Sequence, residues 1–133
     1  MNVVDSSGWL EYFADGPNAK FFKKAIEAPA ELLVPTLSVY EVFKRVLQQR
    51  GEGEALLAVA VMQQSAVVEL TAPLALAAAR GSVDLGIPMA DSIILATARA
   101  SDATLWSQDA DFANVPGIRY LAKSRHFRRL RRC

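Results

Sequence analysis

The sequence predicts an α/β domain of three layers, in which helices flank a short and mainly parallel β-sheet. Short apolar strands alternate along the chain with segments of helical periodicity, which is typical of βαβ units. The chain has 133 residues, of which 52% are hydrophobic and 22% charged, enough for one hydrophobic core. We therefore expect one domain over residues 1–122, followed by a short basic tail over residues 123–133.

Five short strands are predicted from apolar runs that end at turn or helix signals. The first ends at the turn-forming sequence Asp-Ser-Ser-Gly that begins at Asp5, and the second is closed by Pro35. The last is expected at an edge of the sheet. The predicted strands are Val3–Val4, Leu32–Val34, Ala66–Leu70, Thr104–Trp106 and Ile118–Tyr120.

Helices are predicted between the strands from their apolar periodicity and from proline and glycine near their ends. Pro17 lies near the first turn of one helix and Pro88 opens another, while Gly51 and Gly86 follow helices in the position that glycine prefers. The predicted helices cover residues 7–13, 17–28, 37–50, 54–64, 73–85 and 88–100.

Charge is distributed unevenly along the chain. Residues 123–133 hold six of the fifteen Lys and Arg and no acid, so residues 1–122 carry nine bases against fourteen acids. An acidic body of this kind suggests that several carboxylates gather in one place to hold cations.

Several classes of protein are excluded by what the sequence lacks. The only histidine, His126, excludes a Ser-His-Asp triad and a multi-histidine zinc site. Neither a GxxxxGK[ST] nor a GxGxxG phosphate-binding loop occurs. No apolar run approaches the ~20 residues that span a bilayer, and no signal peptide is apparent. With a single cysteine, Cys133, the chain is expected to be cytoplasmic and not to associate with membranes.

Four acidic residues are placed where the predicted fold forms a site. In open parallel sheets, sites form at the C-terminal ends of the strands. Asp5 follows the first strand, Glu41 lies just past the second, and Asp109 follows the fourth. These three acids therefore point to the same edge of the sheet. Asp91 lies in the first turn of the helix that precedes the fourth strand.

Two of these acids have ordinary structural interpretations. Asp5 stands where a helix N-cap is expected. Glu41 falls outside the apolar face of its helix, so its alternative is a solvated residue paired with Arg45 one turn later. Only its closeness to the strand end favours a functional role.

The helix face of Asp91 favours a functional role, whereas the position of Asp109 fits a structural and a functional role equally well. Asp91 shares its helix face with Ile94, Leu95 and Ala98, and a buried carboxylate is costly unless it is paired or metal-bound. Asp109 and Asp111 form an Asp-x-Asp pair after a strand, which is common in turns but can also ligate a cation.

Taken together, the acids predict a metal site. Two carboxylates about 5 Å apart repel by roughly 3 kcal/mol at an effective dielectric of 20, so a cluster needs protons or hard cations. Oxygen ligands alone favour Mg²⁺ or Mn²⁺, ions that serve phosphodiester cleavage.

The segments that carry these acids resemble the PIN-domain family, and specifically its VapC-type toxins from VapBC toxin–antitoxin modules. VVDSSGWLEYF is similar to the family's first strand with its Asp-x-Ser motif, and SVYEVFKRV to the segment with its glutamate. GIPMADSIILATARA resembles the helix of the third acid, and WSQDADF the closing acid motif. The motifs follow the family's order over roughly residues 2–120.

The resemblance implies an Mg²⁺- or Mn²⁺-dependent endoribonuclease that hydrolyses RNA with metal-activated water. Its implied partners are the RNA substrate, a cognate VapB-type antitoxin and a second copy of the chain in a homodimer. The implied catalytic and metal-binding residues are Asp5, Glu41, Asp91 and Asp109.

Three further residues take supporting roles by the same resemblance. Ser7 would support the first acid, and Ser107 stands where the family usually has threonine. Asp111 would be either an auxiliary acid or a structural turn residue.

Surface features suggest how partners are contacted. The apolar helices at 37–47 and 54–62 predict a groove or a dimer contact. The bases expected to offset the acidic site toward RNA are Lys20, Lys23, Lys24, Lys44, Arg45, Arg50 and those of the tail.

Two alternatives stay open, namely a PIN-type nuclease of RNA processing or DNA cleavage without a toxin role, and an interaction module without activity. A receiver domain is disfavoured because the third strand ends in Val68-Glu69-Leu70-Thr71, without an acceptor aspartate.

Overall fold

The structure is a computed structural model that describes residues 1–124, so most of the predicted basic tail lies outside the described residues. Within them the strands form one sheet in the order β3-β2-β1-β4-β5, and every neighbouring pair is parallel. The strands are β1 (Asn2–Val4), β2 (Leu32–Pro35), β3 (Ala66–Val68), β4 (Thr104–Ser107) and β5 (Arg119–Tyr120).

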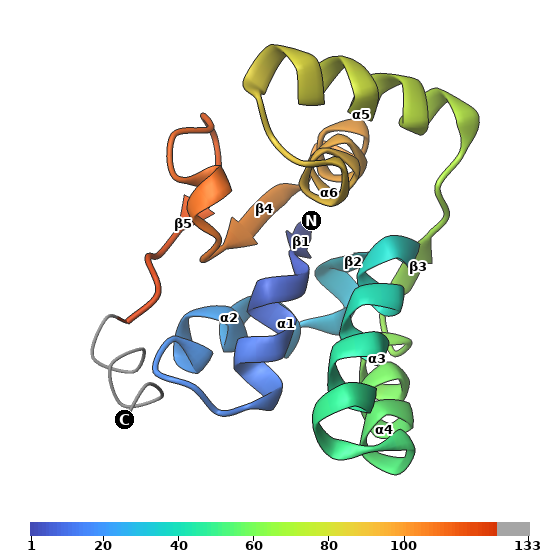
Figure 1. Ribbon diagram of the computed structural model, residues 1–133, viewed down its shortest axis with the longest axis vertical. Helices are drawn as coiled ribbons and strands as arrows, with labels where there is room; N and C mark the ends of the chain where they lie inside the picture. The colour runs from blue at the N-terminus through green and yellow to red at the C-terminus, as the bar shows by residue number, and fades with distance from the viewer. Residues whose placement is uncertain (125–133) are drawn as a thin grey trace.

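Helices separate the strands along the chain, as the parallel pairing requires (Figure 1). Among residues 1–124, no helix combines the length and the apolar character needed to cross a membrane. The helices are α1 (Ser6–Phe13), α2 (Ala19–Ile26), α3 (Thr36–Arg50), α4 (Glu52–Met62), α5 (Ala72–Leu85) and α6 (Met89–Ala100), with 3₁₀ turns η1 (Pro29–Glu31) and η2 (Ala110–Phe112).

Two apolar clusters lie on opposite faces of the sheet, because successive side chains of a strand point to opposite sides. Val4 of β1 packs with residues of α1, α2, α3 and α4 in one cluster. Its neighbour Val3 packs with Ile94 and Leu95 of α6 and with Phe112 of η2 in the other. The predicted three-layer α/β fold is thus confirmed, with a sheet that is parallel throughout the described strands.

The element boundaries differ from the predicted ones by a few residues. The third strand was expected to reach Leu70, but β3 ends at Val68. Thr71 is already the N-cap of α5, with its side chain accepting a hydrogen bond from the Leu74 amide, so the chain has to turn before it. Gly51 and Gly86 follow their helices as predicted, both with positive φ.

Candidate active site

Asp5 follows β1 and is held in place through both carboxylate oxygens. Oδ1 accepts hydrogen bonds from the Gly8 amide at 2.9 Å and the Ser7 hydroxyl at 2.8 Å. Oδ2 accepts from the Ser107 hydroxyl at 2.5 Å. Asp5 is the N-cap of α1, as its structural interpretation predicts, and it is only 2% exposed. Capping therefore orients this carboxylate and does not exclude a further role.

Burial is the main influence on the charge of Asp5. Desolvation raises its pKa to about 6, although the hydrogen bonds from Ser107, Gly8 and Ser7 act in the opposite direction. The nearby carboxylate of Asp109 adds a smaller upward contribution. Deprotonated Asp5 therefore has three donors but no positive partner within the described residues, which favours the arrival of a cation.

Glu41 lies in α3 and is half-buried, because α1 packs beside this helix (Figure 1). Its Oε1 accepts a hydrogen bond from the Ser6 hydroxyl at 2.6 Å. The alternative of a solvated pair with Arg45 is wrong: over residues 1–124, the one ion pair within 4.0 Å joins Arg50 and Glu54. Glu41 lies outside the face that meets the sheet, but that side of α3 is covered by α1.

Asp91 lies in the first turn of α6, on the same face as the buried Ile94, Leu95 and Ala98, as its spacing predicts. It is half-buried. Desolvation is the largest influence on its pKa, which is raised to about 8 with further contributions from the carboxylates of Asp109, Asp111 and Asp5. Burial and the neighbouring carboxylates therefore both favour the neutral form of Asp91.

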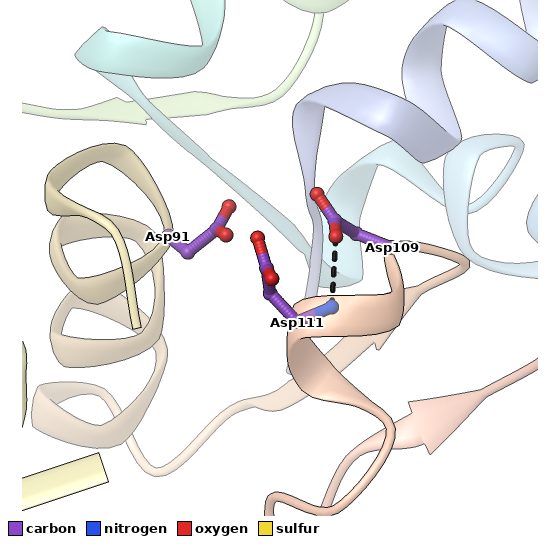
Figure 2. Close-up of side chains that lie close together, drawn as sticks. All are labelled: Asp91, Asp109 and Asp111. Atoms are coloured by element: carbon purple, nitrogen blue, oxygen red, sulfur yellow. Dashed lines mark hydrogen bonds between the residues drawn. The ribbon is translucent and has the colours of Figure 1, made fainter. Parts of the chain in front are cut away.

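Asp109 and Asp111 lie in the turn that follows β4. The Asp109 amide donates to the Ser107 hydroxyl at 2.9 Å, and the Asp109 side chain accepts from the Asp111 amide at 2.9 Å. Figure 2 shows that the carboxylates of Asp109 and Asp111 reach toward that of Asp91 on α6. Each of the three offers one oxygen such that these atoms lie within 4.8 Å of one another. The turn pairing predicted for Asp-x-Asp and the clustering of acids therefore occur together.

The four predicted acids meet in one cavity of about 300 Å³. They come from four separate segments of the chain, at the C-terminal edge of the sheet. Ser107 lies behind the cavity, fully buried, and Asp111 stands at the exposed edge of the cluster. The cavity is lined by Asp5, Ser6, Ser7, Leu10, Glu41, Arg45, Asp91, Ile94 and Asp109.

Two lining residues could not be placed here from the sequence. Ser6 bridges α1 to Glu41 through the hydrogen bond from its hydroxyl. Arg45 was one of several bases expected near RNA, and it lines the cavity itself. Neither position is predictable from a periodicity, because both depend on how α1 lies against α3.

A second cavity of about 480 Å³ adjoins the acidic one, since both are lined by Ser7, Leu10 and Arg45. It lies against the helices whose apolar character predicted a groove. Its walls are largely apolar and include Leu10, Phe13, Val46, Leu57, Ala58 and Val61.

The acidic cavity suits a hard divalent cation. Its charged ligands are carboxylates, and the pKa values of Asp5 and Asp91 are raised, so a positive charge would relieve the cost of ionising them. Asp5, Glu41, Asp91 and Asp109 line the cavity and Asp111 adjoins them, so these residues could hold the ion. Sites of this donor set support metal-assisted hydrolysis of phosphodiesters.

The family comparison agrees with this fold, a parallel sheet flanked by helices. The family model of the PIN domain matches residues 3–118. The chain belongs to the PIN-domain family, whose members are nucleases. A sequence comparison with curated proteins finds no significant match.

Solved structures of toxin–antitoxin proteins share this fold. A toxin–antitoxin complex from Klebsiella pneumoniae has a TM-score of 0.72 at 22% identity, covering 89% of this chain and 95% of that one. VapC20 of Mycobacterium tuberculosis, described as a toxin that cleaves the sarcin-ricin loop, has a TM-score of 0.74 at 18% identity, covering 90% of this chain and 98% of that one. VapBC2 of Rickettsia felis, bound to DNA from its promoter, has a TM-score of 0.70 at 11% identity, covering 92% of this chain and 98% of that one.

Proposed function

We propose that this protein is an Mg²⁺- or Mn²⁺-dependent endoribonuclease, the toxin of a VapBC-type toxin–antitoxin pair. One observation carries the proposal: Asp5, Glu41, Asp91 and Asp109 line a single cavity of a PIN domain. We assign the nuclease to residues 1–122 and treat residues 123–133 as an appended basic tail. The expected setting is the cytoplasm.

In this proposal Asp5, Glu41, Asp91 and Asp109 bind the cation. The cation supplies an activated water and stabilises the charge that develops on the phosphodiester oxygens. Ser7 and Ser107 hold the two oxygens of Asp5, and Ser6 holds Glu41, so these ligands are oriented before any ion arrives. A bound cation would favour the ionised form of Asp91, whose pKa is raised by burial and by its acidic neighbours. Asp111 serves as an auxiliary acid beside Asp91.

The toxin assignment draws on the structural neighbours and on the second cavity. Several neighbours are toxin–antitoxin complexes. The apolar cavity beside the acids suits an apolar segment of an antitoxin, which would cover the active site and keep it inactive. A charged side chain introduced at Val61, which lines this cavity, should weaken antitoxin binding. Val59 does not line the cavity, so the same substitution at Val59 is the matched control.

A homodimer is the second partnership that we propose. Large apolar side chains are exposed on α3 and α4, and a dimer contact would remove them from water. They are Tyr40, Leu47, Leu56 and Leu57, with exposed fractions between 42% and 69%. The measurement is the molar mass in solution, and a monomer at all concentrations would contradict the dimer.

A cleavage assay with purified protein tests the activity. RNA and single-stranded DNA of the same sequence are incubated with Mg²⁺ or Mn²⁺, with EDTA in a parallel series. The wild type should cut RNA only with the metal, and Asp5→Asn and Asp91→Asn should each lose at least about 100-fold. The control is Asp84→Asn, an exposed acid of α5.

Each alternative predicts a different pattern. Cleavage of DNA in preference to RNA would favour a PIN nuclease without a toxin role. Cleavage that survives EDTA, or that is equal in the wild type and both site variants, would refute the carboxylate-metal mechanism.

A further inference from the structure

Arg45 lies where the acidic cavity meets the apolar one. It lines both, together with Ser7 and Leu10. Among the described residues that line the acidic cavity, Arg45 is the only base. Arg45 therefore lines the same cavity as four carboxylates, one from its own helix and three from other segments.

The nearest acid along its helix does not neutralise Arg45. Glu41 is one turn earlier, the usual spacing for an ion pair in a helix, but its Oε1 accepts the Ser6 hydroxyl at 2.6 Å. Within residues 1–124 the one ion pair within 4.0 Å is Arg50–Glu54, so Arg45 is not held by a carboxylate there. Its side chain is exposed. A binding role explains this arrangement better than a structural one.

The substrate of the proposed function creates a need for such a charge. A phosphodiester strand is repelled by a cavity of carboxylates, and a bound divalent cation offsets only part of four acidic charges. A guanidinium presents five N–H donors in a planar fork, which matches the oxygens of a phosphate.

We propose that Arg45 binds a phosphate of the substrate strand next to the scissile one and so holds the strand across the acidic cavity. This inference rests on the proposed function and adds to it a substrate-binding residue. The acids bind the cation, and Arg45 supplies the anchor for the polyanion at the mouth of the same cavity.

Lys44 provides a matched control. It is the neighbouring base on the same helix and is also exposed. The sequence places Lys44 with Arg45 among the bases expected near RNA, but in the structure Lys44 lines neither cavity, so we do not assign it to substrate binding. Its ammonium lies 5.7 Å from the centre of the Tyr40 ring. Arg45→Ala and Lys44→Ala therefore remove the same charge from α3, one at the cavity mouth and one away from it. Arg45→Lys keeps the charge and loses the planar fork.

The experiment measures binding apart from cleavage. Fluorescence anisotropy of a labelled single-stranded RNA in EDTA gives its Kd at several salt concentrations, and steady-state cleavage with Mg²⁺ gives KM and kcat. Arg45→Ala should raise Kd and KM about tenfold, with a smaller change in kcat, and Arg45→Lys should lie between. The slope of log K against log salt should shrink by about 0.7. Lys44→Ala should stay within about twofold of the wild type.

Mn²⁺ affinity, measured by calorimetry without RNA, separates this role from an effect on the acids. Arg45→Ala should bind Mn²⁺ as tightly as the wild type or more tightly, because it loses a nearby positive charge. Weaker Mn²⁺ binding with unchanged RNA affinity would overturn the proposal.

The remaining outcomes are also decisive. Equal RNA Kd and KM for Arg45→Ala and Lys44→Ala, in a wild type that cleaves RNA, would overturn the role of Arg45 and leave the proposed function intact. Loss of antitoxin binding alone would assign Arg45 to a protein partner and overturn it as well. A wild type that neither binds nor cleaves RNA would overturn both.

Discussion

Replacing Asp91 with asparagine should stabilise the metal-free protein while abolishing its activity. The carboxylate of Asp91 lies within 4.8 Å of those of Asp109 and Asp111 (Figure 2). At that separation each ionised pair repels by about 3 kcal/mol at an effective dielectric of 20 and by about 1 kcal/mol in bulk water. Because Asp91 is only half-buried, solvent screening lowers the gain from removing its charge to about 1–2 kcal/mol.

The effect should depend on pH with a defined sign. The pKa of folded Asp91 is raised from 3.8 to about 8, so its ionisation costs folded-state stability. This cost is absent below about pH 4, grows as the pH rises, and is complete above about pH 8. The free energy of unfolding of Asp91→Asn should therefore equal that of the wild type near pH 4 and exceed it increasingly toward pH 9. There its Tm should be higher by about 3–8 °C.

The assay is thermal unfolding in EDTA at pH 4, 6 and 9, repeated at pH 9 with Mg²⁺. At 100 times its Kd the ion should stabilise the wild type by about 2.7 kcal/mol and so raise its Tm, and it should stabilise Asp91→Asn much less. The difference in stability between the two proteins should then shrink or change sign. Asp84→Asn on α5 controls for the loss of one acid elsewhere. A metal-free Asp91→Asn protein no more stable than the wild type at pH 9 would refute the mutual repulsion.

Two further predictions concern the surroundings of Asp5. Gly8→Ala should destabilise the protein by about 1–3 kcal/mol, because a Cβ there would lie 2.6 Å from both Phe22 Cε1 and Val4 Cγ1 in the core. Gly53→Ala, with nothing within 4 Å of its Cβ, should be neutral or stabilising, and equal urea midpoints for both variants would contradict the packing argument. Ser107→Ala should raise the pKa of Asp5 above its value of about 6, because the Ser107 hydrogen bond lowers it. The pH midpoint of Mn²⁺ binding should then rise, whereas Ser107→Thr keeps the hydroxyl and should leave it in place; an unchanged midpoint in Ser107→Ala would count against this account.

The sheet and its order of strands and helices could be predicted because each signal is local. Short apolar runs ending at Asp5 or Pro35 mark strands, and the change to helical periodicity marks the helices between them. The side of α6 on which Asp91 lies could also be predicted from its own segment, because the helical spacing places it on the same face as Ile94 and Leu95. A residue whose position is set by its own helix or strand can therefore be placed from sequence.

Contacts between elements carry the part of the site that could not be predicted. Asp111 reaches the cluster because the turn after β4 lies opposite α6, and nothing in either segment encodes that separation (Figure 2). In the sequence its two interpretations, a turn residue and an auxiliary acid, are equally compatible with Asp-x-Asp. In the structure Asp111 takes part in the turn through its amide and in the cluster through its carboxylate.

Glu41 shows most clearly why a helical wheel misplaces an acid that lies between two helices. The wheel sorts the residues of α3 by whether they face the sheet, and it assigns everything else to solvent. In the structure α1 forms a second neighbour of α3, and Ser6 from its first turn binds Glu41 at 2.6 Å. The polar side of α3 is thus divided into a part beside α1, which holds Glu41, and a part open to water, which holds Lys44. Arg45 lies at the boundary between them, where both cavities reach it. A polar residue on an apparently solvated helix face is therefore best judged by which helix passes over it, and here that helix begins at the capping residue Asp5, itself one of the four acids.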